Sequence, residues 1–412
     1  MSRSKRKNIA VIVKYFYPVT AGIETNILET YSVLVKKGWD VTIHTSKDTL
    51  DKKNCLSDEE TIRGLKIRRY SHKWYSFFPK INWGKVDVIC LHNFNIFPHF
   101  YILVCGLFLK ISKQKKFSII LTPHGGFTPE WSIFSRISIA IKRFYHYSIG
   151  TFLINKGVDA VRAVSEWEKD QIVGRGVSPN LVHVISNGIE NEAYLDVDSL
   201  VSSQIKRKVK QLGRYIIQIG RIYKIKNYET TIRALSRVSQ DVKYLIIGPT
   251  QEGRQYLNSL KKLIKELKLE DRVLFLGVIK GIDKYYLIKH AQMMVHMAQW
   301  ESFCNVVHEG MSQGLICIVA DNTALPFLIK DRVNGFCIDT YDDKRLAEKI
   351  NYALKYKNGK QLQKMANRNK KIGREMSWEK VADNMDVLYN STFEKSNLQD
   401  EKSIYYKGSY LS

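Results

Sequence analysis

The sequence has few cysteines, and their spacing argues against both disulfides and metal binding. It contains six in 412 residues, and no two of them form a C-x-x-C pair. Several fall inside apolar stretches that are typical of strands. Scattered thiols of this kind are usually buried and reduced. We therefore expect a cytoplasmic protein without structural disulfides.

Long hydrophobic runs are also missing. The longest, residues 96–109, is too short to span a bilayer and is interrupted by Pro98 and His99. The apolar residues 9–13, which follow a basic N-terminus, are too few for the core of a signal peptide and predict a first strand. The sequence thus favours a cytoplasmic protein that is at most peripheral, at the inner face of a membrane.

Acidic residues are scarce relative to basic ones. Lys and Arg number 65 against 40 Asp and Glu, a formal net charge of +25, which predicts an acidic partner. Residues 61–86 combine seven Lys or Arg and six aromatic residues with no acid, and residues 131–150 also mix basic with apolar side chains. Both segments would suit an anionic membrane surface. Single-stranded nucleic acid would fit the first equally well, and an ordinary strand or core helix with exposed lysines would fit either.

What the sequence does contain is a regular alternation of short apolar runs, which predict strands, with amphipathic runs, which predict helices. Its length and its ordinary hydrophobic (44%) and charged (25%) fractions suit two α/β domains. Strands are predicted at residues 9–13, 41–45, 87–91, 117–121, 158–164, 182–188, 215–219, 242–247, 273–276, 293–296 and 315–320. The alternation predicts doubly wound α/β sheets, whose ligands bind at the carboxyl ends of the strands.

Two such strand ends in the first half of the chain carry suitable residues. Gly22 follows the first predicted strand and would let the backbone approach a phosphate closely. His124 follows the strand at 117–121 and is flanked by a proline and two glycines. That setting is as consistent with contact to a ligand as with a structural turn.

A basic loop follows the strand at 215–219. Gly220 allows the chain to turn there, and the guanidinium of Arg221 and the ammonium of Lys226 could together clamp a diphosphate. An exposed basic loop without a ligand is the alternative.

Residues 300–314, WESFCNVVHEGMSQG, predict a loop that runs into a helix with Asn305 as its N-cap. Glu301 would lie in the loop and Glu309 about one turn into the helix. Free backbone N–H groups at the helix start favour anionic or hydroxyl-rich ligands. Two acids at this spacing also occur by chance in many chains.

The pattern E-S-F-x5-E-G-M-x2-G in this segment resembles the E-x7-E signature of retaining glycosyltransferases of the GT-B fold, glycosyltransferase family 4. Residues 220–226 match the family's G-R-x4-K motif, and residues 378–389 resemble its last helix. The similarity covers most of residues 8–392, with the motifs in the expected order.

The resemblance implies two Rossmann-like domains that face a central cleft. Residues 1–197 would bind the acceptor, and residues 198–377 would bind the nucleotide-sugar donor. A helix at 378–395 would cross back to the first domain. The polar tail at 396–412 is expected to be disordered and is given no role.

The resemblance also implies roles for individual residues. Glu309 would hold the ribose hydroxyls, and Arg221 and Lys226 would stabilise the leaving diphosphate. His124 would lie beside the sugar, and Gly22 belongs to the family's first-loop motif. The sugar would be contacted by Glu301 and by the backbone of Phe303, Cys304, Asn305 and Val306.

The implied activity is transfer of a sugar from a nucleotide diphosphate sugar to a hydroxyl, with retention of configuration. We interpret no D-x-D motif or His/Asp cluster as a metal site, and we expect neither a metal nor a cofactor. The basic aromatic segments favour a lipid-linked or membrane-proximal glycan acceptor and an anionic membrane surface as a possible partner. No nucleic acid is expected, because no recognition helix or RNP-type strand is found.

Five positions depart from the family pattern. Ala21 replaces a glycine of the first loop, and Asn227 follows Lys226 where glycine is common. Cys304, Ile316 and Phe327 stand where Gly or Pro, Pro, and Glu are usual. These departures leave open an epimerase of the same fold, a nucleic-acid-binding protein and a catalytically silent partner subunit.

Overall fold

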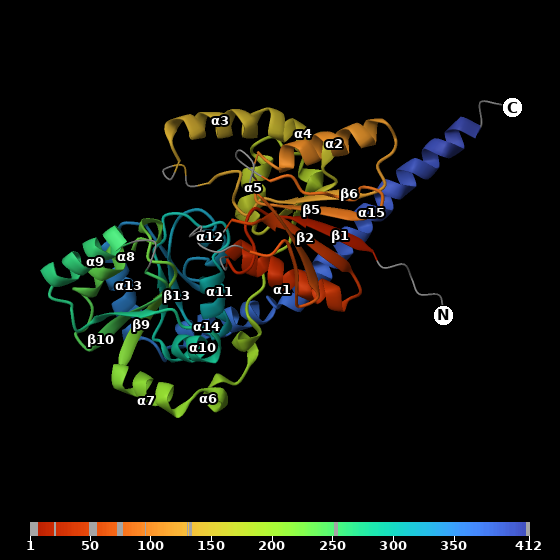
Figure 1. Ribbon diagram of the computed structural model, residues 1–412. Coiled ribbons are helices and arrows are strands. Elements are labelled where there is room, and N and C mark those ends of the chain that lie inside the picture. The colour runs from red at the N-terminus through yellow and green to blue at the C-terminus, as the bar shows by residue number, and fades with distance from the viewer. Residues whose placement is uncertain are drawn as a thin grey trace. The chain divides into compact units, whose positions relative to one another are not determined.

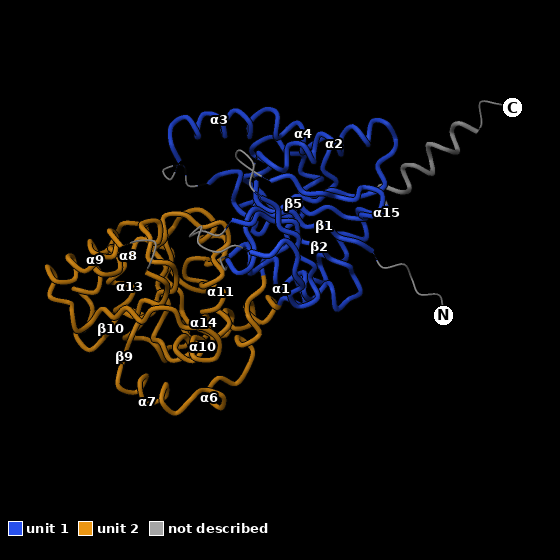
Figure 2. Tube along the Cα trace, in the orientation of Figure 1, with its two compact units in different colours: residues 1–187, 378–412 blue, residues 188–377 orange. Residues whose placement is uncertain are grey.

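The computed structural model describes residues 7–19, 22–48, 56–71, 77–94, 96–129, 131, 134–250 and 254–408, with side chains as far as Glu394. The chain divides into two compact units (Figure 2): unit 1 is residues 1–187 with 378–412, and unit 2 is residues 188–377. The division lies before the boundary that we expected after residue 197. Each unit is built on one largely parallel sheet with helices, which confirms the predicted α/β class.

Unit 1 contains an eight-stranded sheet in the order β3-β4-β2-β1-β5-β6-β7-β8. All pairs are parallel except β3 with β4, which is antiparallel. The strands are β1 (Asn8–Ile12), β2 (Asp40–Ser46), β3 (Glu59–Ile62), β4 (Leu65–Tyr70), β5 (Val88–His92), β6 (Ser118–Thr122), β7 (Ala160–Ala163) and β8 (Val182–Val184). The sequence order reverses on the two sides of β1, which is the topology of a doubly wound sheet.

The helices of unit 1 cover both faces of this sheet (Figure 1). They are α1 (Gly22–Lys36), α2 (His99–Ile111), α3 (Arg136–Tyr147), α4 (Ile149–Gly157), α5 (Glu166–Val173) and α15 (Trp378–Gly408). Side chains of β1 alternate between the faces. Ile9 and Val11 pack in a core with α1 and α15, whereas Ala10 and Ile12 pack in a second core with α2 and α4.

Unit 2 contains a six-stranded, fully parallel sheet in the order β11-β10-β9-β12-β13-β14. The strands are β9 (Arg214–Ile219), β10 (Val242–Ile247), β11 (Val273–Gly277), β12 (Met294–His296), β13 (Cys317–Ala320) and β14 (Gly335–Ile338). Almost every residue of β9, β10, β12 and β13 is buried, as expected for strands with helices on both faces.

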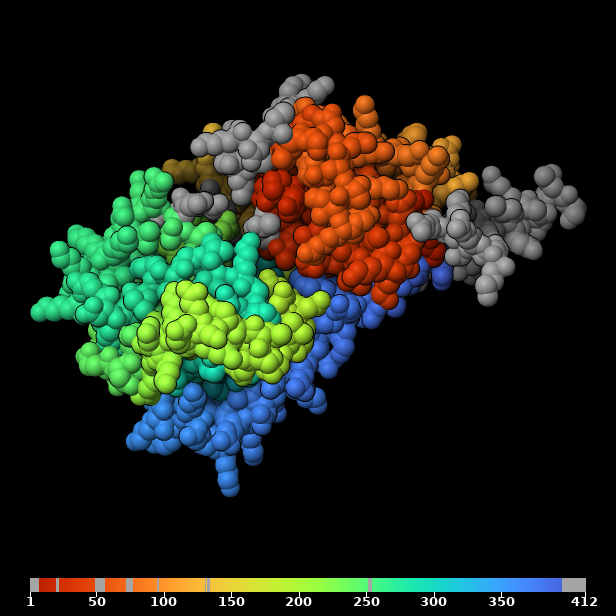
Figure 3. Space-filling view, turned by 60° about the horizontal axis from the view of Figure 1, so that its bottom comes forward, coloured from red at the N-terminus to blue at the C-terminus, as the bar shows by residue number. Residues whose placement is uncertain are grey.

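The helices of unit 2 are α6 (Val197–Leu200), α7 (Ser203–Leu212), α8 (Tyr228–Leu235), α9 (Arg254–Glu266), α10 (Gly281–His290), α11 (Asn305–Ser312), α12 (Leu325–Leu328), α13 (Asp343–Lys355) and α14 (Lys360–Arg374). Side-chain caps start several of them: Ser202 Oγ accepts from the backbone of Ile205, and Asp342 does the same for α13. α6 and α7 pack against α10 and form an outer surface of this unit, yellow-green in Figure 3.

The basic aromatic segment at 61–86 is mostly an ordinary strand pair and loop where it is described. Arg69 is buried and pairs with Glu60, and the Phe77 ring is fully buried and stacks on Tyr70. Residues 73–75, part of the suggested membrane segment, lie outside the described residues. The described aromatic side chains therefore serve the core of unit 1 more than its surface.

The C-terminal helix is longer than expected. α15 runs from Trp378 to Gly408, past the predicted end at residue 395, so the expectation that the tail is disordered from residue 396 is wrong as far as Gly408. Trp378, Met385 and Tyr389 of this helix are buried in unit 1. Within the described residues, none of the helices has the length and apolar character to traverse a bilayer.

Candidate active site

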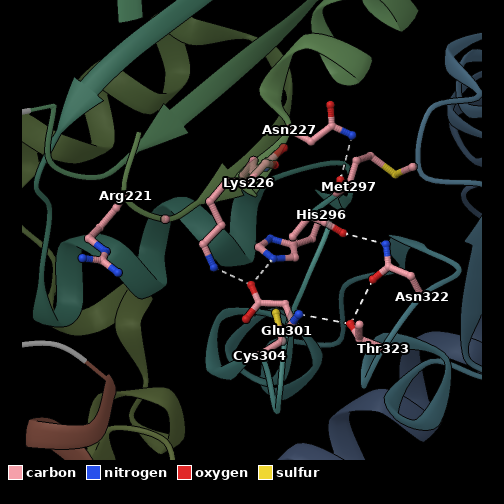
Figure 4. A network of polar contacts seen from close by, with 12 residues as sticks. Arg221, Lys226, Asn227, His296, Met297, Glu301, Cys304, Asn322 and Thr323 are labelled. Atoms are coloured by element: carbon pink, nitrogen blue, oxygen red, sulfur yellow. Dashed lines mark hydrogen bonds and ion pairs between the residues drawn. The ribbon is translucent and has the colours of Figure 1, made fainter. Parts of the chain in front are cut away.

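The residues predicted to bind the donor lie where the strand order of the second sheet reverses. β9 lies between β10 and β12, so successive crossovers leave it in opposite directions. Ligands of doubly wound sheets bind outside the carboxyl ends of the strands at such a reversal. Gly220, Arg221 and Lys226 follow β9, and Glu301 follows β12. The topology therefore brings the two predicted motifs together within unit 2 (Figure 4).

Glu301 is the centre of a compact polar cluster. Lys226 Nζ lies 2.5 Å from Glu301 Oε1, and His296 Nε2 lies 2.8 Å from the same oxygen. Figure 4 shows both side chains converging on the carboxylate. The backbone N–H of Glu301 donates to Thr323 Oγ1 at 3.0 Å. Glu301, expected to contact the sugar, thus also holds Lys226 in place.

The charges of this cluster follow from its surroundings. Burial would raise the pKa of Glu301, but the Lys226 ammonium and the hydrogen bond from His296 outweigh burial and lower this pKa to about 2. Burial lowers the pKa of His296, and Glu301 only partly opposes it. The neutral imidazole donates from Nε2 to the carboxylate, and its buried Nδ1 has no hydrogen-bond partner among the described residues. The cluster is therefore an ion pair braced by a neutral histidine.

Asn227 explains one departure from the family pattern. Its backbone is left-handed, with φ 48° and ψ 58°, a conformation that glycine and asparagine adopt most readily. Its side-chain amide donates to the carbonyls of Met297 and Thr340 at 2.9 and 2.8 Å. The asparagine keeps the backbone conformation that a glycine would allow and ties the loop after β9 to the chain after β12 and β14.

The start of α11 differs from the prediction in one respect. Asn305 is not the N-cap but the first helical residue. Cys304 occupies the cap position in a left-handed conformation, with φ 70° and ψ 71°, and gives no side-chain hydrogen bond to the helix. This conformation accounts for the glycine frequent there in the family. The Phe303 ring stacks on His308 with centroids 4.2 Å apart, which braces the first turn, and Val306 packs against the core of unit 2.

Glu309 has a different cationic partner from Glu301. Its Oε2 lies 3.2 Å from Nζ of Lys284, a buried lysine on α10 that also donates to Glu190 Oε2 at 2.6 Å. Burial raises the pKa of Glu309, and the Lys284 charge only partly opposes this effect. The same two carboxylates outweigh burial and raise the pKa of Lys284. The two glutamates that we expected to converge on one ligand are thus each placed by a separate lysine.

In unit 1, Gly22 is the first residue of α1 and follows β1, next to the reversal of strand order. A methyl group added at its Cα would meet no heavy atom of the described residues within 4 Å. The packing of unit 1 therefore does not demand a glycine here, and the space in front of it is open to a ligand.

His124 lies at the end of a chain of hydrogen bonds. Its Nε2 is 2.9 Å from Nδ1 of His92, whose Nε2 is 2.9 Å from the Tyr31 hydroxyl. That hydroxyl is 2.8 Å from the hydroxyl of Tyr389 on α15. Burial lowers the pKa of His92 and brings the pKa of His124 to about 3, so both imidazoles are neutral at neutral pH. The chain orients His124 and couples it to the C-terminal helix.

The loop that carries His124 is tightly built. A methyl group on Gly126 would lie 2.7 Å from Cβ and 2.8 Å from the backbone nitrogen of Phe94, so only glycine fits. The backbone N–H of Gly125 donates to the buried carboxylate of Glu168, which also accepts from the backbone of Val164 at 2.7 Å. Burial raises the pKa of Glu168 to about 7. The two glycines noted in the sequence thus serve the loop's shape.

Comparison with protein families agrees with this geometry in both units. Residues 202–372 match the model of glycosyl transferases group 1, and residues 20–193 match that of glycosyltransferase family 4. The chain is a family 4 glycosyltransferase. Together the two models include the loop after β1, His124 and all the donor-side residues described above.

Relatives and solved structures of this glycosyltransferase are distant in sequence. The GPI3 subunit of phosphatidylinositol N-acetylglucosaminyltransferase from Saccharomyces cerevisiae is 22% identical over 81% of this chain and 72% of the relative. GDP-mannose:cellobiosyl-diphosphopolyprenol alpha-mannosyltransferase from Xanthomonas oryzae is 24% identical over 75% of this chain and 77% of the relative. Anabaena Alr3699/HepE, solved with UDP and glucose, superposes with a TM-score of 0.69 at 18% identity, covering 94% of this chain and all of that one.

One group in this glycosyltransferase has the side chains for a metal ion, contrary to our reading of the sequence. The ligand atoms of His296, Glu301 and Cys304 all lie within 4.8 Å of one another. Burial raises the pKa of the Cys304 thiol, which disfavours the thiolate that a metal would need. Lys226 Nζ and His296 Nε2 already contact the same oxygen of Glu301. The donor set fits the ion pair better than a divalent cation.

Sequence reasoning missed several residues of the site. His92 and His296 end β5 and β12, and the rule that selected His124, a histidine at the carboxyl end of a strand, would have found both. Lys284 and Glu190 gave no such signal, because they meet Glu309 only through the packing of α10.

Proposed function

We propose that this glycosyltransferase moves a sugar from a nucleotide diphosphate sugar to a hydroxyl group, with retention of configuration and without a metal ion. The observation that supports this best is the cluster of Lys226, Glu301 and His296 at the strand-order reversal of unit 2. It keeps a cation at the position where a doubly wound sheet binds the phosphates of its ligand.

Departure of the diphosphate builds negative charge on its phosphate oxygens, and catalysis requires groups that stabilise this charge. Lys226 would exchange its contact with Glu301 for a phosphate oxygen, and Arg221 would approach from the same exposed loop. The first-turn N–H groups of α11 favour an anion at the same end of the sheet. These groups stabilise the leaving group without a metal.

The remaining donor contacts follow from position. Glu309 would accept hydrogen bonds from the ribose hydroxyls, with Lys284 keeping its carboxylate ionised. Glu301 and the backbone of residues 303–306 would contact the sugar. On unit 1, His124 would lie beside the sugar, and Gly22 would leave room for the phosphates. We assign no carboxylate nucleophile, since Glu301 is held by Lys226 and His296.

We propose a lipid-linked glycan precursor as the acceptor, in surface polysaccharide or glycolipid synthesis near a membrane. The printed functions of two relatives support this, because one acts on phosphatidylinositol and the other on a diphosphopolyprenol-linked sugar. The net charge of +25 agrees with an anionic surface nearby.

The donor is tested by thermal shift against UDP-, GDP-, ADP- and dTDP-linked sugars, with and without EDTA. We expect stabilisation by one nucleotide family that survives EDTA and is lost in Glu309→Gln. Glu348→Gln, an exposed glutamate on α13 of the same unit, is the matched control and should respond as wild type. No response to any nucleotide would refute donor binding, and a response abolished by EDTA would refute metal independence.

Retention is tested on the product. With the donor and a short-chain lipid-linked acceptor, NMR of the new glycosidic bond should show the anomeric configuration of the donor sugar. An inverted bond would contradict the proposed reaction while leaving the family assignment intact.

A further inference from the structure

Three neighbouring helices of unit 1 expose large apolar side chains to solvent. α2 packs against α4, and α4 packs against α3, so they lie side by side over one face of the sheet (Figure 1). On α2 and α3 the exposed residues recur at i, i+4 and i+7, which is one stripe along each helix. These stripes are Val104, Phe108 and Ile111 on α2, and Ile137, Ile141 and Phe144 on α3.

These six residues, with Phe152 on α4, are called the three-helix face. Ile137, Phe144, Phe108 and Ile111 are 67 to 75% exposed. The opposite side of α2 contributes Ile102 and Leu103 to the core beside the sheet, so its exposed stripe points away from the sheet. Contiguous exposed apolar surface of this kind marks an interaction site. It also shows that the segment at 131–150 is not a buried core helix.

The charge around the three-helix face is of one sign. Between residues 88 and 158 the sequence has eight Lys or Arg and one acid, Glu130. Exposed cations lie on all three helices, with Lys110 on α2, Arg136 and Arg143 on α3 and Lys156 on α4. Lys110 Nζ donates to the carbonyl of Lys156 at 3.0 Å, which places two of these cations together where α2 and α4 meet.

Apolar stripes flanked only by cations fit the interface of an anionic bilayer. Ile and Phe side chains enter the boundary between headgroups and acyl chains, while Lys and Arg extend to the phosphates. A second copy of the chain is disfavoured, because pairing two such faces would bring like charges together. We propose that the three-helix face docks this glycosyltransferase on an anionic lipid bilayer.

The proposal deepens the proposed function, on which it rests for the purpose of docking: a bound enzyme would meet a lipid-linked acceptor at the membrane. Binding to lipid is nevertheless independent of catalysis. Donor binding belongs to unit 2 and docking to unit 1, so each can fail without the other.

The test is cosedimentation of the full chain with vesicles of phosphatidylcholine containing about 30% phosphatidylglycerol, and with pure phosphatidylcholine, at low and high salt. Wild type should bind the anionic vesicles, and salt should weaken binding. Ile137→Ser/Ile141→Ser/Phe144→Ser should bind at least tenfold more weakly. Arg136→Gln/Arg143→Gln should lose about fivefold per cation at low salt.

The matched control is Leu200→Ser/Val278→Ser/Val387→Ser, which removes three apolar residues that are 57, 56 and 68% exposed on other elements. It should bind vesicles as wild type does. Equal vesicle binding by the α3 variant and wild type would overturn the proposal, as would binding unaffected by lipid charge. Concentration-dependent self-association without vesicles, lost in the α3 variant, would assign the face to a second copy instead.

A nucleotide thermal shift on the same variants separates the two proposals. If the α3 variant loses vesicle binding but keeps the nucleotide response, the docking surface is supported. If wild type shows the nucleotide response but no vesicle binding, docking fails and the donor assignment stands. If vesicles bind and no nucleotide does, the proposed function fails and docking stands.

Discussion

Replacing Lys226 with methionine tests the central ion pair of the site. In wild type, Lys226 and His296 lower the pKa of Glu301 from an ordinary value near 4.5 to about 2, a difference worth about 3 kcal/mol. The Glu301 side chain is only 12% exposed, so solvent screens the pair weakly. Without the lysine, a buried carboxylate keeps only a neutral imidazole, and we expect a loss of about 3 kcal/mol at pH 7. For a unit of this size the melting temperature should fall by roughly 6–12 °C.

The pH dependence should change sign. The folded pKa of Glu301 in wild type lies below its unfolded value, so this group stabilises the fold above about pH 4.5 and ceases to do so as the pH falls toward 2. In Lys226→Met, burial dominates and the folded pKa rises above the unfolded one. The variant should therefore lose stability as the pH rises from 4 to 7, relative to wild type.

The assay is differential scanning calorimetry of four proteins, namely wild type, Lys226→Met, Glu301→Gln and the double variant. Replacing both partners removes the buried charge, so the double variant should recover most of the loss of Lys226→Met. Lys224→Met, an exposed neighbour in the same loop, is the control and should melt within about 2 °C of wild type. Additive single effects, or a loss below about 1 kcal/mol, would refute the pairing of Lys226 with Glu301.

Three further changes probe the rest of the site. Lys284→Met should weaken donor binding about tenfold, because Glu309 loses its cation and protonates; a nucleotide titration at pH 6 and pH 8 should show weaker binding at the lower pH. His92→Phe should lower kcat by about 10- to 100-fold while the nucleotide thermal shift stays unchanged, since it frees the catalytic-side histidine from its partner; an unaltered kcat would contradict this role. Gly126→Ala should cost about 1–3 kcal/mol in thermal unfolding, because its methyl group would overlap Phe94, and a stability equal to wild type would disprove the close packing.

The sequence predicted most of the sheets because buried parallel strands are written as short apolar runs. β10 was predicted with its observed bounds at residues 242–247, and β1 lies within one residue of its prediction. β3 and β14 were not predicted. β3 reads EETI with two exposed residues, and β14 is the four-residue GFCI, so neither carries a sustained apolar pattern.

For the candidate site, position along the chain was predictable and pairing was not. The motif residues follow β9 and β12, as strand ends require, and this depends only on local sequence. That Glu301 pairs with Lys226 and Glu309 with Lys284 depends on contacts across 75 and 25 positions of the chain. No periodicity encodes such contacts, and without the fold each acid was free to be assigned to the ligand alone.

Asn227 offers a comparison between two substitutions that separates backbone strain from hydrogen bonding. Asn227→Gly keeps the left-handed conformation but loses the two bonds to Met297 and Thr340, which should cost about 2 kcal/mol. Asn227→Ala loses the same bonds and adds a left-handed penalty of about 1 kcal/mol. Alanine should therefore be the less stable variant by about 1 kcal/mol in urea unfolding. An alanine variant as stable as the glycine variant would mean that the loop relaxes out of this conformation, and with it the position of Lys226.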